Sequence, residues 1–173
     1  MYLGAPPDLR QYLLDAPPAE TPQQARTSYG PHIQYESYSQ LWYGNRWIAD
    51  ELCPSTLPIP PEVTQWVRRH HPGLGVRTLH ANQYRRRHKK GADRALHWHF
   101  DAETLRTDLV FFWSEPVAHK LQFENCDEPV YVVPQIAIGI SSKFMFKNEH
   151  VGQHAAMYDG TPYTTWVMRC DYV

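Results

Sequence analysis

The stretch Leu96-His97-Trp98-His99-Phe100-Asp101 decides how the rest of the chain is interpreted. Its last three residues form a His-x-Asp motif. In a β-strand, residues two positions apart project from the same face, so this spacing places an imidazole beside a carboxylate. His97 shares that face, where it either approaches a substrate or supports the other two groups.

An imidazole and a carboxylate on one face supply two thirds of a facial triad of two His and one carboxylate. That set holds ferrous iron and leaves coordination positions open for a cosubstrate and dioxygen, and it accepts manganese as well. The third ligand would be a His further along the chain, and His150 and His154 are both available. The motif therefore predicts a metal site that contains His99, Asp101 and one of these two residues.

Length and composition indicate one domain with a sizeable core, because the chain has 173 residues. Six Trp, eleven Tyr and six Phe make it rich in aromatic residues. Fifteen Pro and a mean hydropathy of -0.58 favour short elements, many turns and a well-solvated surface. The formal net charge is -1, so the global charge predicts no polyanionic partner.

Compartment is indicated by the cysteines and by the apolar runs. Cys53, Cys126 and Cys170 are odd in number and lack zinc-type spacing, which favours a reduced intracellular chain. No apolar run approaches the roughly 20 residues of a membrane span, and the N-terminus does not resemble a secretion signal. We expect a soluble intracellular protein, cytoplasmic or nuclear, with no membrane partner.

Short β-rich segments separated by Pro, Gly, Asn and Asp are typical of a sandwich or jelly roll. A helix is expected over residues 62–71, opened by Pro60 and Pro61, and a short one over residues 8–14. The fold class is therefore predicted as mainly β with flanking helices (α+β), in the form of a double-stranded β-helix. Residues 1–32 are expected to be a peripheral extension of a domain over 33–173. The expected strands are 33–38, 76–84, 108–113, 118–123, 130–133, 135–140, 143–147 and 164–169.

Aromatic side chains are dense between residues 33 and 47, where Trp42 and Tyr43 stand next to each other. One interpretation is ordinary packing in the core and at sheet edges. The other is a lid whose rings stack on a flat substrate such as a nucleobase. Both interpretations stay open from the sequence.

A dense basic run follows the strand expected over residues 76–84. It contains Arg85, Arg86, Arg87, Lys89 and Lys90 and ends at Gly91. Because it lies between two expected strands, it is predicted as a loop. It is either a solvated turn or a set of phosphate contacts just before the His-x-Asp strand, and we favour phosphate contacts.

Spacing along the chain suits a metal site inside a double-stranded barrel, where a His-x-Asp on one strand lies against a His from a much later strand. His154 lies 53 residues beyond Asp101, and His150 lies 49 residues beyond it. Arg169 ends the last expected strand, where its guanidinium would bind a cosubstrate carboxylate through a bidentate fork.

With these motifs in place, the chain resembles the iron(II)- and 2-oxoglutarate-dependent dioxygenases, in their AlkB-like branch, over roughly residues 31–173. The most specific part is Asn82-Gln83-Tyr84, a basic turn that ends in Gly91, then His99-Phe100-Asp101 with the acidic Glu103. The resemblance implies that His99, Asp101 and His154 hold Fe(II), since the Gln-His-Ala context favours His154 over His150.

The same resemblance assigns the binding of 2-oxoglutarate. It implies that Asn82 and Tyr84 hydrogen-bond its carboxylates and that Arg169 is their cationic anchor. AlkB-like proteins usually carry two arginines on this last strand, six residues apart, and here Tyr163 stands at the first position. Tyr163 can donate one hydrogen bond to the distal carboxylate, and Lys143 is a second candidate for that role.

The activity implied by the resemblance is oxidative demethylation or hydroxylation of a nucleobase in DNA or RNA. The basic run and the aromatic segment suit a flipped or single-stranded base. Two alternatives remain: a dioxygenase that hydroxylates a protein side chain or small molecule, and a non-catalytic binding module that keeps the fold. The second alternative is motivated by Tyr163.

Overall fold

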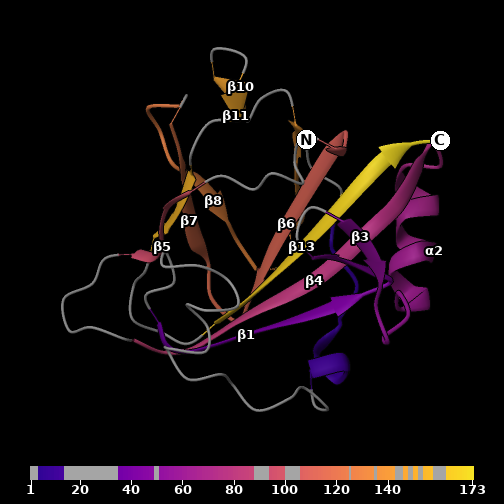
Figure 1. Ribbon diagram of the computed structural model, residues 1–173, viewed down its shortest axis with the longest axis horizontal. Coiled ribbons are helices and arrows are strands. Elements are labelled where there is room, and N and C mark those ends of the chain that lie inside the picture. Colours follow the sequence, from indigo (N-terminus) through magenta and orange to yellow (C-terminus); the bar gives the residue numbers. More distant parts are fainter. Residues whose placement is uncertain are drawn as a thin grey trace.

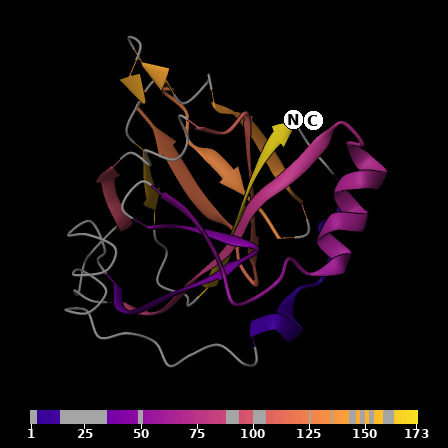
Figure 2. The same ribbon diagram turned by 45° about the vertical axis from the view of Figure 1, so that its right-hand side comes forward.

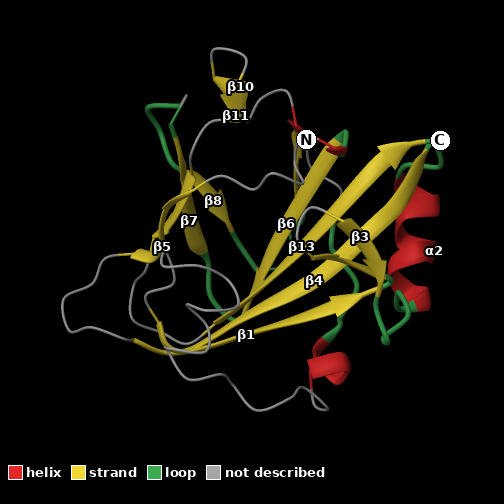
Figure 3. Cartoon of the chain, in the orientation of Figure 1, coloured by secondary structure: helices red, strands yellow, loops and turns green. Residues whose placement is uncertain are grey.

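The structure is a computed structural model that describes residues 4–13, 35–48, 51–87, 94–99, 106–124, 126–134, 136–142, 146–147, 150–151, 154–157 and 163–173. Two antiparallel sheets make up most of this part of the chain, and one α-helix flanks the larger sheet (Figures 1 and 3). Among the described residues, no helix is long and apolar enough to cross a membrane.

The larger sheet has five strands in the order β1-β4-β13-β6-β9. Its long strands fan out side by side through the middle of the molecule (Figure 1). The bounds are β1 Tyr35–Tyr43, β4 Leu74–Arg87, β13 Tyr163–Tyr172, β6 Leu109–Glu115 and β9 Ile138–Ser141.

The smaller sheet has four strands in the order β5-β12-β7-β8. Its bounds are β5 Arg94–His99, β12 His154–Met157, β7 His119–Phe123 and β8 Val130–Val132. Two hairpins pair β2 Asn45–Ile48 with β3 Glu51–Pro54, and β10 Phe146–Lys147 with β11 His150–Val151. The helical elements are the short 3₁₀ turn η1 Arg10–Leu13 and the helix α2 Pro61–His70.

The chain passes repeatedly between the two sheets, which is the topology of a double-stranded β-helix. β5 lies in sequence between β4 and β6, β7 and β8 lie between β6 and β9, and β12 precedes β13. The predicted jelly roll is therefore confirmed. A short segment connects β4 in the larger sheet to β5 in the smaller one. Because β4 ends at Arg87 and β5 begins at Arg94, these two strand ends lie within roughly 25 Å of each other.

Helix α2 forms where the sequence predicts it and covers the outer face of the larger sheet, on the side away from the smaller sheet (Figure 2). Pro61 stands in the first turn, where its missing N–H is not needed. Val63, Trp66 and Val67 lie on one face and are buried, as the spacing i, i+3, i+4 requires. The basic side chains of the last turn favour the negative end of the helix dipole.

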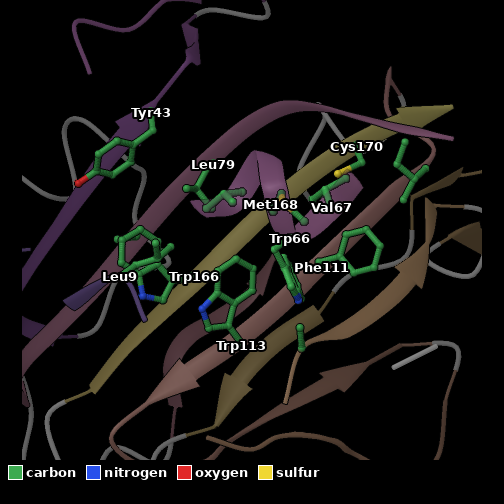
Figure 4. Close-up of a cluster of buried hydrophobic side chains, with 14 of the residues drawn as sticks. Leu9, Tyr43, Trp66, Val67, Leu79, Phe111, Trp113, Trp166, Met168 and Cys170 are labelled. Atoms are coloured by element: carbon green, nitrogen blue, oxygen red, sulfur yellow. The ribbon is translucent and has the colours of Figure 1, made fainter. Parts of the chain in front are cut away.

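Strand β13 is buried on both faces because it lies between two apolar clusters. Trp166, Met168 and Cys170 point toward α2 and pack with Trp113 and Leu9 (Figure 4). The alternate residues of β13 point the other way, toward the interior between the sheets. There the apolar cluster contains Val110, Phe112, Leu121, Phe123, Val132, Ile138, Ile140, Tyr163 and Val167.

The expected strands and helices largely agree with the structure, but several strands differ. Arg85, Arg86 and Arg87 lie within β4 and not in a loop, because this end of the strand pairs with the start of β1. The β2–β3 hairpin was not predicted, and neither were β11 and β12. At the N-terminus, Asp8 Oδ1 accepts a hydrogen bond from the Arg10 N–H at 3.1 Å, and Leu9 is 1% exposed. Leu9 packs in the same apolar cluster as Trp66 and Trp166.

Candidate metal and cosubstrate site

Two of the predicted metal ligands are direct neighbours in the smaller sheet. His99 at the end of β5 is the register partner of His154 at the start of β12. Directly opposed residues of an antiparallel pair share a face, with Cβ atoms roughly 4.5–5.5 Å apart. The backbone of the smaller sheet therefore brings these two positions side by side.

The rival ligand His150 lies in a different part of the fold. It pairs with Lys147 in the β10–β11 hairpin, which belongs to neither large sheet. Asp101 lies outside the described residues, and so does the Glu103 that follows it. Among the side chains that are described, no group of three His, Cys, Asp or Glu residues is arranged to hold a metal.

The inner face of the larger sheet carries a group of buried polar side chains around Arg169. Arg169 is 2% exposed, and its register partners are Thr78 on β4 and Val110 on β6. Its Nη1 lies 3.5 Å from Nδ1 of His80, which is itself 3% exposed. A guanidinium with so little exposure inside an apolar barrel is unusual in proteins, because burying a charge is unfavourable without compensating polar contacts.

Two hydroxyls on the same face make this region suitable for a polar ligand. Thr78 Oγ1 and Thr165 Oγ1 are buried, and neither has a hydrogen-bond partner within the described part of the chain. Buried polar atoms are normally hydrogen-bonded, so unsatisfied ones need an explanation. Hydroxyl donors beside a guanidinium match the acceptor oxygens of a carboxylate. The residues present at this face therefore fit the carboxylate end of 2-oxoglutarate.

Asn82 joins this group from β4 and is part of a hydrogen-bonded chain. Its Oδ1 accepts a hydrogen bond from Gln40 Nε2 at 2.8 Å, and Gln40 Oε1 accepts one from Trp42 Nε1 at 2.8 Å. The Trp42 ring stacks on His80 with centroids 4.2 Å apart and planes inclined by 27°. Asn82 on β4 and Arg169 on β13, both predicted to bind the cosubstrate, thus lie on one face of two adjacent strands.

The two tyrosines of the predicted cosubstrate set are register partners. Tyr84 on β4 lies opposite Tyr163 on β13, and nothing more of Tyr84 than its backbone is described. Tyr163 is 4% exposed and packs in the apolar cluster with Val110 and Phe112. The residue at the position where AlkB-like proteins commonly have a first arginine therefore packs against apolar side chains here.

The predicted substrate residues are spread over several elements. Arg85, Arg86 and Arg87 end β4, and His97 lies two residues before His99 on β5. Lys89 and Lys90, like the candidate Lys143, lie outside the described residues.

Trp42 and Tyr43 point to opposite faces of β1. Trp42 stacks on His80, whereas Tyr43 is 3% exposed in the cluster beneath α2 and donates a hydrogen bond to the carbonyl of Tyr12 at 2.9 Å. For Tyr43 the structure shows the packing alternative.

Sequence reasoning did not single out His80 or Gln40. The signal for His80 was available, because the alternation of residues 76–84 places it on the same face as Asn82. Gln40 had no comparable signal, since its role depends on the pairing of β1 with β4. Burial raises the pKa of the Cys170 thiol to about 12, so this thiol is protonated at neutral pH.

Comparison with known proteins identifies the fold. The chain is similar to the solved structure of OsALKBH1, with a TM-score of 0.51 and 10% sequence identity over 76% of this chain and 78% of that one. It is also similar to an oxidoreductase of the 2OG-Fe(II) oxygenase family from Burkholderia pseudomallei, with a TM-score of 0.49 and 11% identity over 94% of this chain and 75% of that one. No protein-family model and no curated protein sequence matches. The chain thus resembles the AlkB-like 2OG-Fe(II) oxygenases in its fold.

Proposed function

We propose that this protein, which has the jelly-roll fold of the AlkB-like oxygenases, is an Fe(II)- and 2-oxoglutarate-dependent dioxygenase. The observation that carries the proposal is the direct pairing of His99 with His154 on β5 and β12. This pairing brings together two separate sequence features, the His of the His-x-Asp and a His more than 50 residues later. If the two histidines had no shared role, we would not expect them to lie directly opposite each other on β5 and β12.

In this proposal His99, Asp101 and His154 hold Fe(II), and Arg169, Asn82 and Tyr84 bind 2-oxoglutarate. When bound, the iron couples decarboxylation of 2-oxoglutarate to succinate with insertion of one oxygen atom from dioxygen into a substrate C–H bond. The contribution of the chain is to fix these groups relative to one another and to exclude water. The buried larger-sheet face around Arg169 serves both purposes.

For the substrate we propose a nucleobase in single-stranded or flipped-out DNA or RNA, demethylated or hydroxylated at the site. The likeness to OsALKBH1, an AlkB homologue by name, favours this class. The basic residues Arg85, Arg86 and Arg87 favour it too, because they stand at the end of β4 from which the chain continues into β5. Basic side chains there would contact phosphates while the base reaches the metal. Lys89, Lys90 and His97 complete this proposed substrate set.

A second candidate function is a binding module that keeps the fold without catalysis. Tyr163 favours it, because this residue packs among apolar side chains and supplies no positive charge for the distal carboxylate of 2-oxoglutarate. The two candidates differ in whether 2-oxoglutarate binds at all.

The deciding experiment is an anaerobic titration of the protein with Fe(II) followed by 2-oxoglutarate, monitored by the weak visible charge-transfer band of the chelate. We expect the band in the unmodified protein, and we expect it to be lost in His99→Ala and Arg169→Ala. His70→Ala, at the exposed end of α2, is the matched control and should retain it. Metal binding without the band would favour the binding module, and absence of metal binding would contradict both the metal site and the dioxygenase.

The substrate class is tested separately by binding of single-stranded oligonucleotides. Neutralising Arg85, Arg86 and Arg87 together should weaken binding and flatten its dependence on salt, by up to about three ions in the slope of log K against log salt. A triple Ala variant that binds oligonucleotides as the unmodified protein does would contradict a nucleic-acid substrate held by this segment.

A further inference from the structure

A continuous series of side-chain contacts connects the two described residues that are proposed to bind 2-oxoglutarate. It runs from Asn82 to Gln40, from Gln40 to Trp42, from Trp42 to His80 and from His80 to Arg169. Gln40 and Trp42 come from β1, Asn82 and His80 from β4, and Arg169 from β13. These three strands are neighbours in the larger sheet.

The register of the strands accounts for this series. Gln40 lies opposite Asn82, and Trp42 lies opposite His80, so each β1 residue meets its partner directly across the ladder. On the other side of β4, His80 lies opposite Val167, two residues before Arg169. The arrangement thus follows from alternation along three paired strands and not from a loop conformation.

The contact between Arg169 and His80 indicates which tautomer of the imidazole suits this site. A guanidinium has N–H donors and no acceptor, so Nδ1 of His80 must carry the lone pair that faces Arg169 Nη1. The imidazole is then neutral, with its proton on Nε2. A protonated imidazole at this position would place two positive charges 3.5 Å apart in a buried site.

Trp42 holds the imidazole in that orientation. One face of its indole ring stacks on His80, its Nε1–H is donated to Gln40, and the residue is 8% exposed. Because one face of the indole ring and its N–H already contact other residues, we do not expect Trp42 to act as a lid that stacks on a substrate base. Its position instead restricts rotation of the His80 ring about χ2, which a single long hydrogen bond would not do.

We propose that His80 is a positioning residue for cosubstrate binding, and that Trp42 and Gln40 hold it in place. By accepting from Nη1, His80 sets the plane of the Arg169 guanidinium, so that its fork meets the 2-oxoglutarate carboxylate in a bidentate geometry. Gln40 orients the amide of Asn82 in the same way. Because Asn82 Oδ1 accepts the hydrogen bond from Gln40 Nε2, the amide nitrogen of Asn82 is directed away from Gln40. The proposal rests on the proposed function, since it assigns these roles within the same site.

A pair of His80 variants separates the acceptor atom from the ring that packs. His80→Phe keeps an aromatic ring against Trp42 but removes the acceptor, whereas His80→Asn keeps an acceptor near Nδ1 and loses the ring. Tyr12→Phe is the matched control, because it retains its ring and loses the 2.6 Å hydrogen bond to Glu62, on the helix side of the larger sheet. Each variant is titrated with Fe(II) and then 2-oxoglutarate, and each is unfolded in urea.

We expect His80→Phe to raise the dissociation constant of 2-oxoglutarate about tenfold or more, with Fe(II) affinity unchanged, since hydrogen bonds to charged groups are among the stronger ones. His80→Asn should lose less, and Tyr12→Phe should leave the constant within about twofold. Equal binding by His80→Phe and the unmodified protein would overturn the proposal. So would equal losses in His80→Phe and Tyr12→Phe, because that result would indicate a general loss of stability.

A measurement on the metal-free protein keeps this inference distinct from the proposed function. In ¹⁵N NMR of histidine-labelled protein, His80 should show the neutral tautomer with the proton on Nε2, and the Nδ1 signal should shift in Arg169→Gln. A proton on Nδ1, or an imidazole that is charged at neutral pH, would overturn the positioning role even if 2-oxoglutarate binds. The expected tautomer without any cosubstrate binding would support the contact and would contradict the proposed function alone.

Discussion

Replacing Gly139 by Ala should destabilise the protein by forcing a side chain into the cluster beneath α2. Gly139 lies on β9 opposite Phe111 of β6, and a Cβ added there would stand 2.2 Å from Phe111 Cε1 and 2.7 Å from Cδ1. Carbon atoms in contact are normally about 3.5–4.0 Å apart. The Phe111 ring would therefore have to move by more than an ångström, and it is 0% exposed.

The magnitude follows from two opposing effects. Overpacking a well-filled core costs about 1–3 kcal/mol, and a Gly-to-Ala change at an unstrained position returns about 0.4–1 kcal/mol by restricting the unfolded chain. The net expectation is a loss of about 1–2 kcal/mol in the free energy of unfolding. For a domain of this size that corresponds to a fall in Tm of about 2–8 °C.

Urea unfolding monitored by tryptophan fluorescence measures this loss, and the chain supplies a matched control. A Cβ at Gly73 would meet nothing within 4 Å, so Gly73→Ala should change stability by no more than about 0.5 kcal/mol. Phe111→Leu combined with Gly139→Ala should cost less than the sum of the single changes, because the smaller side chain relieves the contact. A Gly139→Ala variant as stable as the unmodified protein would refute the packing of β9 on β6 described here.

Two further predictions concern titratable groups. The hydrogen bond and charge of Arg10 lower the pKa of Asp8 to about 2, so an NMR titration should show this low pKa, and the pKa should return toward 3.8 in Arg10→Gln. Because the folded pKa is depressed, the contribution of this pair to stability is present at neutral pH. That contribution is lost as the pH falls from about 4 toward about 2. An unshifted Asp8 would contradict the pairing at η1. Burial keeps Cys170 protonated, so in the native protein a thiol reagent should modify the half-buried Cys53 and Cys126 and spare Cys170 until the protein unfolds. Rapid modification of Cys170 in the native state would show that α2 does not cover β13 as described.

Local patterns in the sequence predicted α2 and most of the long strands, but not the short hairpin strands. Helix α2 follows from two prolines at its start and from the spacing of Val63, Trp66 and Val67. The strands follow from alternation and from the turn residues between them. The strand character of Arg85–Arg87 was missed because charge runs usually indicate loops, whereas pairing with a distant strand, β1, extends β4 through them.

The candidate site was predictable in its residue types but not in its arrangement. His99, Asp101, His154 and Arg169 have recognisable spacing, but the pairing of His99 with His154 depends on which strands pair, and strand pairing is a property of the whole fold. For the same reason the alternatives His150 and His154 could not be separated by spacing alone. The contact of His80 with Arg169 is a further example, because it joins residues 89 positions apart in the chain.

Binding of Fe(II) by three single variants tests the central claim most directly. His99→Ala, His154→Ala and His150→Ala are each titrated anaerobically with Fe(II) against a chromophoric chelator, and folding is checked by circular dichroism. The pairing of β5 with β12 predicts that the first two variants lose the bound equivalent of Fe(II) and that His150→Ala, in the β10–β11 hairpin, retains it. Loss of Fe(II) in His150→Ala with retention in His154→Ala would contradict the account.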